Sequence, residues 1–97
     1  MLENKDVLVA RMADDLPILR KKLRLSQEGL AEIIGVSRFT VTLYETQKRT
    51  IPWNVFLALV FVFDKNKETS VLLKALGIYT KELDDFLLID PRNSLSK

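Results

Sequence analysis

Side chains that commonly carry out acid–base, nucleophilic or metal chemistry are scarce in this chain. It contains no His and no Cys, which excludes disulfides, thiolate nucleophiles, and the commonest general base and transition-metal ligand. Asp84 and Asp85 are adjacent carboxylates, but neighbouring residues on a helix point in different directions, so we interpret them as surface charges. We therefore expect no catalytic residues, no metal site and no cofactor.

Basic side chains are concentrated in one part of the chain. Residues 17–51 carry seven Lys or Arg and three Glu, a net charge of +4. Residues 1–16 have a net charge of −2, and residues 52–97 are neutral. A basic patch confined to part of a small domain favours a polyanionic partner such as nucleic acid. A solvated Lys/Arg face without a partner is the alternative interpretation.

The elements that position these basic residues are expected to be helices. The chain has 97 residues, 47% of them apolar, with 3 Gly and 3 Pro, which favours one all-α domain. We expect a core over residues 14–77, an N-terminal arm over residues 1–13, and a short C-terminal helix with a tail over residues 78–97. The longest apolar run has nine residues, while a membrane span needs about 20. Without a signal-peptide pattern, we expect a cytoplasmic protein with no membrane partner.

Capping residues and apolar spacing predict where the helices begin and end. Asp14, Asp15 and Pro17 predict the start of the first helix, preceded by an extra turn or arm over Val7–Met12 with a break near the proline. Gly35 predicts the end of the second helix. The helices after the first are expected over residues 27–34, 37 to about 45, 52–63, 66–77 and 81 to about 88, with caps at Ser26, Ser37, Asn66 and Thr80. The residues expected to face inward in the first two are Leu16, Leu19, Leu23, Leu30, Ile33 and Ile34.

The apolar run Val55–Phe63 is rich in Val and Phe and could form a strand or a helix. A lone strand between helices has nothing to pair with, so we predict a helix. A helix that is apolar on every side must be covered on every side. If its core face holds Trp53, Phe56, Leu57, Val60 and Phe63, the C-terminal helix, the N-terminal arm or a second subunit must cover Val55, Ala58, Phe61 and Val62.

The helices expected over residues 27–34 and 37–45 are joined by a short turn that contains Gly35. Two helices joined in this way form a helix-turn-helix, which places its second helix in the major groove of DNA. Ala31 supplies the small side chain that crossing helices need, and Gly35 tolerates the positive φ of the turn. The positions that must be buried are also apolar: Leu30, Ile34, Val36, Val41 and Tyr44.

The segment from Leu19 to Arg49 resembles the phage repressor/Cro-type (XRE) family of helix-turn-helix regulators. The similarity covers roughly residues 16–63, and its motifs are Leu25-Ser26-Gln27, Leu30-Ala31, Gly35-Val36-Ser37, and Tyr44-Glu45 followed by Lys48-Arg49. The resemblance implies a five-helix repressor-like DNA-binding domain, here with a short extra C-terminal helix, that dimerises and binds inverted-repeat operators. The departures from the family pattern are Arg24 in place of Gly, Gly29 in place of a frequent Glu, and Thr46-Gln47 in place of a Gly-containing turn.

Residues at the start of a recognition helix reach base edges first. The base-reading residues are therefore expected to be Ser37, Arg38, Phe39 and Thr42. Arg38 could bind guanine O6 and N7, and Phe39 could pack on a thymine methyl group. The alternatives are a solvated Arg and a buried Phe, but Val41 and Tyr44 already occupy the inward face, so we expect Phe39 to face outward.

Four further residues are expected to contact DNA phosphates: Gln27, Thr40, Lys48 and Arg49. Gln27 begins a helix, where free N–H groups and the helix dipole favour an anion, and the resemblance adds a contact from its side chain; a plain surface Gln is the alternative. Lys48 and Arg49 directly follow the recognition helix. The resemblance also implies that Arg20 pairs with Glu45, tying the first helix to the third, rather than binding DNA.

Two functions of different classes remain open. The first is a DNA-binding transcriptional regulator that binds double-stranded DNA as a homodimer and reads its operator through residues 37–45. The second is an antitoxin whose helix-turn-helix controls its own operon while an apolar surface neutralises a toxin partner. The apolar residues Val55, Ala58, Phe61 and Val62, or the amphipathic segment Leu83–Ile89, could serve either function.

Overall fold

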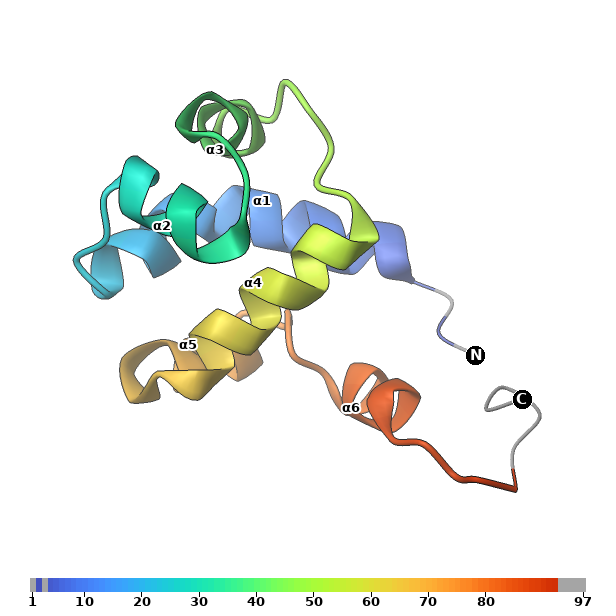
Figure 1. Cartoon of the computed structure of the whole chain (residues 1–97). Helices are drawn as coiled ribbons and strands as arrows, with labels where there is room; N and C mark the ends of the chain where they lie inside the picture. The colour runs from blue at the N-terminus through green and yellow to red at the C-terminus, as the bar shows by residue number, and fades with distance from the viewer. Residues whose placement is uncertain (1, 3, 93–97) are drawn as a thin grey trace.

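The computed structural model describes residue 2 and residues 4–92. Within them the chain forms helices and no strand, as predicted (Figure 1). The helices are α1 (Lys5–Lys22), α2 (Gln27–Ile34), α3 (Arg38–Glu45), α4 (Trp53–Lys65), α5 (Lys67–Ala75) and α6 (Lys81–Leu87). The part of the predicted tail beyond residue 92 lies outside the described residues.

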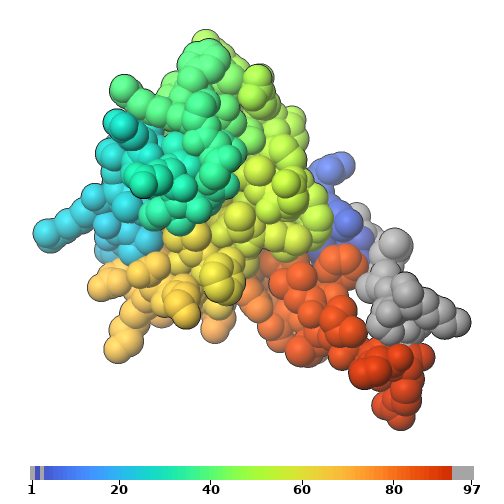
Figure 2. Space-filling view, in the orientation of Figure 1, coloured from blue at the N-terminus to red at the C-terminus, as the bar shows by residue number. Residues whose placement is uncertain are grey.

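The long helix α1 lies behind the others and contacts α3, α4 and α5 (Figure 1). The helices α2 and α3 pack on each other, as do α4 and α5, and α4 crosses in front of α1 and also contacts α2. In Figure 2, α6 and the segment after it extend from this body at one end. The molecule is accordingly elongated, with extents of 42 × 25 × 21 Å.

The structure corrects the predicted start of the first helix and the predicted N-terminal arm. Residues 5–13 belong to α1, and Leu8 and Met12 are fully buried in the core. The helix runs through Pro17 without ending, although a proline inside a helix removes one backbone hydrogen bond. Leu16 and Leu19 are also inaccessible, so the apolar stripe is buried on both sides of the proline. Burial of several large apolar side chains stabilises the helix by more than one lost hydrogen bond costs.

The predicted caps of α2, α3 and α6 are present. Ser26 Oγ accepts the Gly29 N–H at 2.9 Å, and Ser37 Oγ accepts the Thr40 N–H at 3.0 Å. Thr80 Oγ1 likewise accepts the Leu83 N–H at 3.1 Å at the start of α6. Each hydroxyl satisfies an N–H group that has no partner within its own helix.

The predicted cap of α5 is different. Asn66 occupies the cap position, but its side chain forms no cap bond to α5. The side-chain Nδ2 instead donates to the Val62 carbonyl at 2.8 Å and closes the end of α4. The buried Thr69 hydroxyl donates to the Phe63 carbonyl at 2.6 Å. Together these bonds satisfy carbonyl groups that the end of α4 leaves unpaired.

The apolar run is a helix, as predicted, and its faces are partly as expected. Phe56 and Phe63 are fully buried, and Pro52 precedes α4 rather than lying in its first turn. Val55, predicted to point away from the core, is buried, because α1, α2 and α5 cover α4 on several sides. Phe61 remains 70% exposed.

One inward-facing residue predicted for α2 is also corrected. Ile33 is 53% exposed, because α2 packs its Leu30 and Ala31 against the core instead.

None of the described helices combines the length and the hydropathy needed to cross a membrane.

Candidate nucleic-acid interface

The pair α2 and α3 is joined by a tight turn over residues 35–37. Gly35 adopts φ 78°, and the N–H groups of Gly35 and Val36 both donate to the Ala31 carbonyl, at 2.9 and 3.0 Å. Leu30 and Ala31 of α2 are buried, as are Val41 and Tyr44 of α3. Because the turn is bonded to α2 and the facing sides of both helices are buried, α3 has one fixed orientation.

A hydrogen-bonded network under α3 ties three helices together. Arg20 of α1 donates twice to Glu45 of α3, from Nε to Oε2 at 2.7 Å and from Nη2 to Oε1 at 3.1 Å. Gln27 of α2 donates from Nε2 to Glu45 Oε1 at 3.0 Å and accepts the Thr42 hydroxyl at 3.0 Å. The side chains of the Arg20–Glu45 pair are 11% and 6% exposed, so the expected ion pair between α1 and α3 is present and largely buried.

The network sets the charge state of its members. Burial raises the pKa of Glu45, but the hydrogen bonds from Arg20 and Gln27 and the positive charges of Arg20 and Lys21 outweigh it, so its pKa is lowered overall. The hydrogen bond to Glu45 raises the pKa of Arg20. Both groups are therefore charged at neutral pH, and a two-bond Arg–carboxylate contact is geometrically specific as well as strong.

The opposite side of α3 faces solvent. Phe39 is 69% exposed, in the outward position predicted for it, and the neighbouring Arg38 is also exposed. Within residues 4–92 the Arg38 guanidinium forms no hydrogen bond or ion pair. Single exposed apolar side chains are common on protein surfaces, and Phe61 is equally exposed. What distinguishes Phe39 is its position next to Arg38 in α3. The exposed side of α3 therefore offers a free cation beside an aromatic ring.

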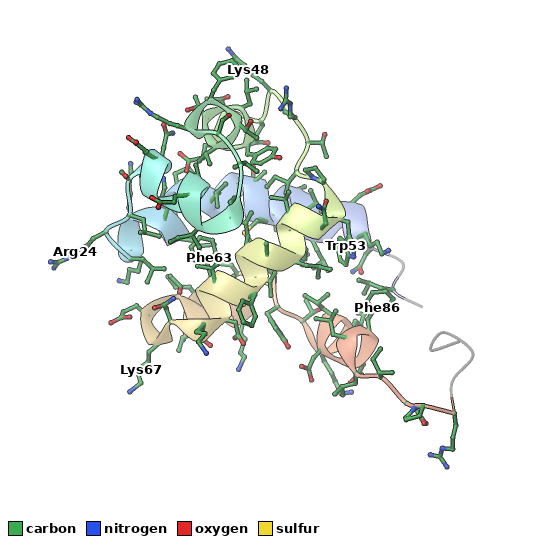
Figure 3. All side chains as sticks on the ribbon, viewed as in Figure 1. Arg24, Lys48, Trp53, Phe63, Lys67 and Phe86 are labelled. Atoms are coloured by element: carbon green, nitrogen blue, oxygen red, sulfur yellow. The ribbon has the colours of Figure 1, made fainter. Side chains whose placement is uncertain are left out.

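The loop after α3 carries the two cations predicted to contact phosphates. Lys48 and Arg49 are both exposed, and their backbone N–H groups donate to the Leu43 carbonyl at 2.9 and 3.2 Å. These bonds attach the loop to the last turn of α3, and Figure 3 shows Lys48 projecting beyond that helix. The two cations are thus held near α3 while their side chains remain in solvent.

Four predicted DNA-contacting residues use their polar groups inside the protein. The Ser37 hydroxyl caps α3 and bonds to the Thr40 hydroxyl at 2.9 Å. Thr42 and Gln27 belong to the network under α3, and both are only half-exposed. The side-chain amide of Gln27 is engaged at both ends, so its contribution to an interface would come from the backbone at the start of α2.

The end of α1 and the turn between α1 and α2 contain cations that sequence reasoning did not assign to the interface. Arg24 is exposed and has φ 59°, a conformation that residues other than Gly, Asn and Asp seldom adopt. Lys21 and Lys22 precede it and are also exposed. The sequence feature that could have indicated these cations is Arg24 itself, which stands where the family that this segment resembles usually has Gly.

The described residues contain no group of His, Cys, Asp or Glu that could hold a metal ion. Comparison with protein-family models, with curated protein sequences and with solved structures gives no match.

Proposed function

We propose that this protein is a sequence-specific DNA-binding transcriptional regulator of the phage repressor/Cro type. In this proposal α3 is the recognition helix of a helix-turn-helix and enters the major groove. The single observation that supports it best is the contrast between the two sides of α3. One side is held to α1 and α2 by the buried Arg20–Glu45 pair, and the other presents the free Arg38 and the exposed Phe39.

This contrast fits the physical demands of reading base sequence. A base-reading helix must have a fixed orientation, because a bidentate contact is lost when its donors are misplaced. Arg38 would donate two parallel hydrogen bonds to guanine, and Phe39 would contact a thymine methyl group. Lys48 and Arg49 would contact phosphates beside the groove, which positions the protein without specifying sequence.

We further propose that the protein binds an inverted repeat as a homodimer, since a two-fold symmetric dimer matches a palindromic site. The antitoxin function is the second candidate. The observation that favours it is the set of exposed apolar residues away from α3, which could contact a toxin: Phe61, Leu88 and Ile89. Purification from the native host separates these candidates, because an antitoxin would copurify with a second chain at fixed stoichiometry.

The experiment that tests the proposal is selection of bound duplexes from a random-sequence pool. Wild-type protein should enrich an inverted repeat. The Arg38→Ala protein should relax one position in each half-site, with a loss of about 1–3 kcal/mol of discrimination there. No enrichment by folded wild-type protein would contradict the proposal.

The Lys48→Ala variant is the matched comparison, since it removes a cation from the loop rather than from α3. It should weaken binding to all duplexes about equally and lower the slope of log affinity against log salt concentration by about 1. If Arg38→Ala and Lys48→Ala both reduce affinity uniformly, α3 does not read bases as proposed.

A further inference from the structure

The end of α1 and the turn that follows it concentrate positive charge: Lys21 and Lys22 are the last residues of α1, and Arg24 lies in the turn before α2. Lys21, Lys22 and Arg24 lie within four residues and are all exposed. Among the described residues, none of their side chains forms a hydrogen bond or an ion pair. They line a hollow with Leu23 and one acidic residue, Glu68 of α5. Like charges gathered in this way repel one another and attract a polyanion.

The backbone of Arg24 adds a second observation. Four described residues have positive φ, and two of them are glycines, which adopt it without strain. The side chain of Gln47, one of the other two, forms a hydrogen bond from its Nε2 to Asp14 Oδ1 at 2.8 Å. Arg24 has the same strained conformation, at φ 59°, and its side chain forms no compensating bond within the described chain. The backbone of the turn is held internally, because the Arg24 and Leu25 N–H groups donate to the Lys21 and Arg20 carbonyls at 2.9 and 3.2 Å. These bonds hold Arg24 in place and leave its guanidinium free to contact a group outside the molecule.

A third observation links this turn to α3. The Arg20 guanidinium donates from Nη1 to the Leu25 carbonyl at 2.9 Å and from Nε to Glu45 Oε2 at 2.7 Å. One buried group therefore holds both the turn and α3. In Figure 3, Arg24 projects from the body at the turn and Lys48 projects beyond α3, so free cations lie at both ends of the α2–α3 pair.

We propose that Lys21, Lys22 and Arg24 form a second phosphate-binding patch, the turn patch. It binds the sugar-phosphate backbone of DNA on the other side of α2–α3 from Lys48 and Arg49. This inference rests on the proposed function and deepens it. Because Arg20 fixes the turn patch relative to α3, the patch sets the register of α3 in the groove and reads no sequence itself.

The test uses fluorescence anisotropy with two labelled duplexes, one enriched in the selection and one of scrambled sequence, at several salt concentrations. Arg24→Gln removes the charge and keeps the backbone strain, whereas Arg24→Lys keeps the charge. Lys74→Gln is the matched control, because Lys74 is an exposed cation at the end of α5 beside α6. Melting curves establish that each variant is folded.

Arg24→Gln should weaken binding to both duplexes about fivefold at 0.15 M salt and lower the salt slope by about 1, as expected for one lost phosphate contact. Arg24→Lys should retain most of the affinity, and Lys74→Gln should match the wild-type protein. If Arg24→Gln binds both duplexes with unchanged affinity and slope, the turn patch is wrong while the regulator proposal stands. The turn-patch proposal is also overturned if Arg24→Lys loses as much affinity as Arg24→Gln. It is likewise overturned if Arg24→Gln weakens binding to only one of the two duplexes. Binding of neither duplex by wild-type protein overturns both proposals.

Discussion

At the residue scale, Glu45 is the side chain on which the orientation of α3 depends most directly. It accepts bonds from Arg20 of α1 and from Gln27 of α2, at distances between 2.7 and 3.1 Å. It therefore connects the three helices around the proposed interface. Loss of its charge would leave the Arg20 guanidinium, 11% exposed, without a counter-charge in a largely desolvated place.

We predict that Glu45→Gln lowers the free energy of unfolding at pH 7 by about 3 kcal/mol, because removing one partner of a buried pair leaves the other charge uncompensated. Urea denaturation measures this loss. Glu32→Gln, a change at an exposed carboxylate of α2, is the control and should stay within about 0.5 kcal/mol of wild type. Equal stability of the two variants would show that the pair contributes little.

The same carboxylate predicts a pH dependence. The pKa of Glu45 is lowered from its ordinary value of 4.5 in the folded protein, so the unfolded state binds a proton more readily. Its contribution to stability is therefore fully present above about pH 4.5 and is lost as the pH falls through the lower folded-state pKa. The stability difference between wild type and Glu45→Gln should shrink over that acidic range; a constant difference would contradict the assignment.

At the element scale, the turn between α2 and α3 depends on one backbone conformation. Gly35 has φ 78°, and a Cβ added there would meet no atom within 4 Å. Space is therefore no obstacle to a larger residue, and any cost of substitution comes from the backbone. Gly77 differs from Gly35 in this respect, because a Cβ added at Gly77 would lie 2.9 Å from Nη1 of Arg11.

We predict that Gly35→Ala destabilises the protein by about 1 kcal/mol, because an L-residue with a Cβ is strained in the left-handed conformation. For a domain of this size the melting temperature should fall by about 4–8 °C. Gly35→Asn should lose less, since Asn tolerates this conformation better. A melting temperature unchanged by Gly35→Ala would mean that the turn adjusts without strain.

At the scale of the whole molecule, the last helix is joined to the body by an aromatic cluster near the start of α1. Trp53 stacks on Phe56 with ring centroids 4.9 Å apart and meets Phe86 of α6 edge-on at 6.5 Å. The Lys5 ammonium lies 4.9 Å from the Trp53 ring and 5.4 Å from the Phe86 ring. With Leu83 fully buried, α6 is part of the core although Figure 1 shows it at the end of the molecule.

We predict that Leu83→Ala destabilises the whole protein by about 2–5 kcal/mol, as expected for truncation of a buried leucine. Leu88→Ala is the control, because Leu88 is 70% exposed, and it should change stability by less than about 0.5 kcal/mol. Denaturation is followed by Trp53 fluorescence and by circular dichroism. If the Leu83→Ala fluorescence transition separates from the circular dichroism transition, α6 unfolds independently of the core.

The sequence by itself determined the features that depend on a few neighbouring residues. The caps at Ser26, Ser37 and Thr80, and the left-handed turn at Gly35, follow from groups within four positions of each other. The exposure of Phe39 also followed from local spacing, since Val41 and Tyr44 take the inward side of the same short helix. Such features need no knowledge of the rest of the chain.

Tertiary structure alone decided the features in which distant segments compete. Continuation of α1 through Pro17 depends on the core that its first turns bury, which the local rule for proline does not include. Val55 is buried because α4 has neighbours on several sides, and the Gln27 amide is engaged because Thr42 and Glu45 lie beside it in the fold. Burial and hydrogen-bond partners depend on segments brought together by packing, whereas caps and turns depend on the adjacent backbone.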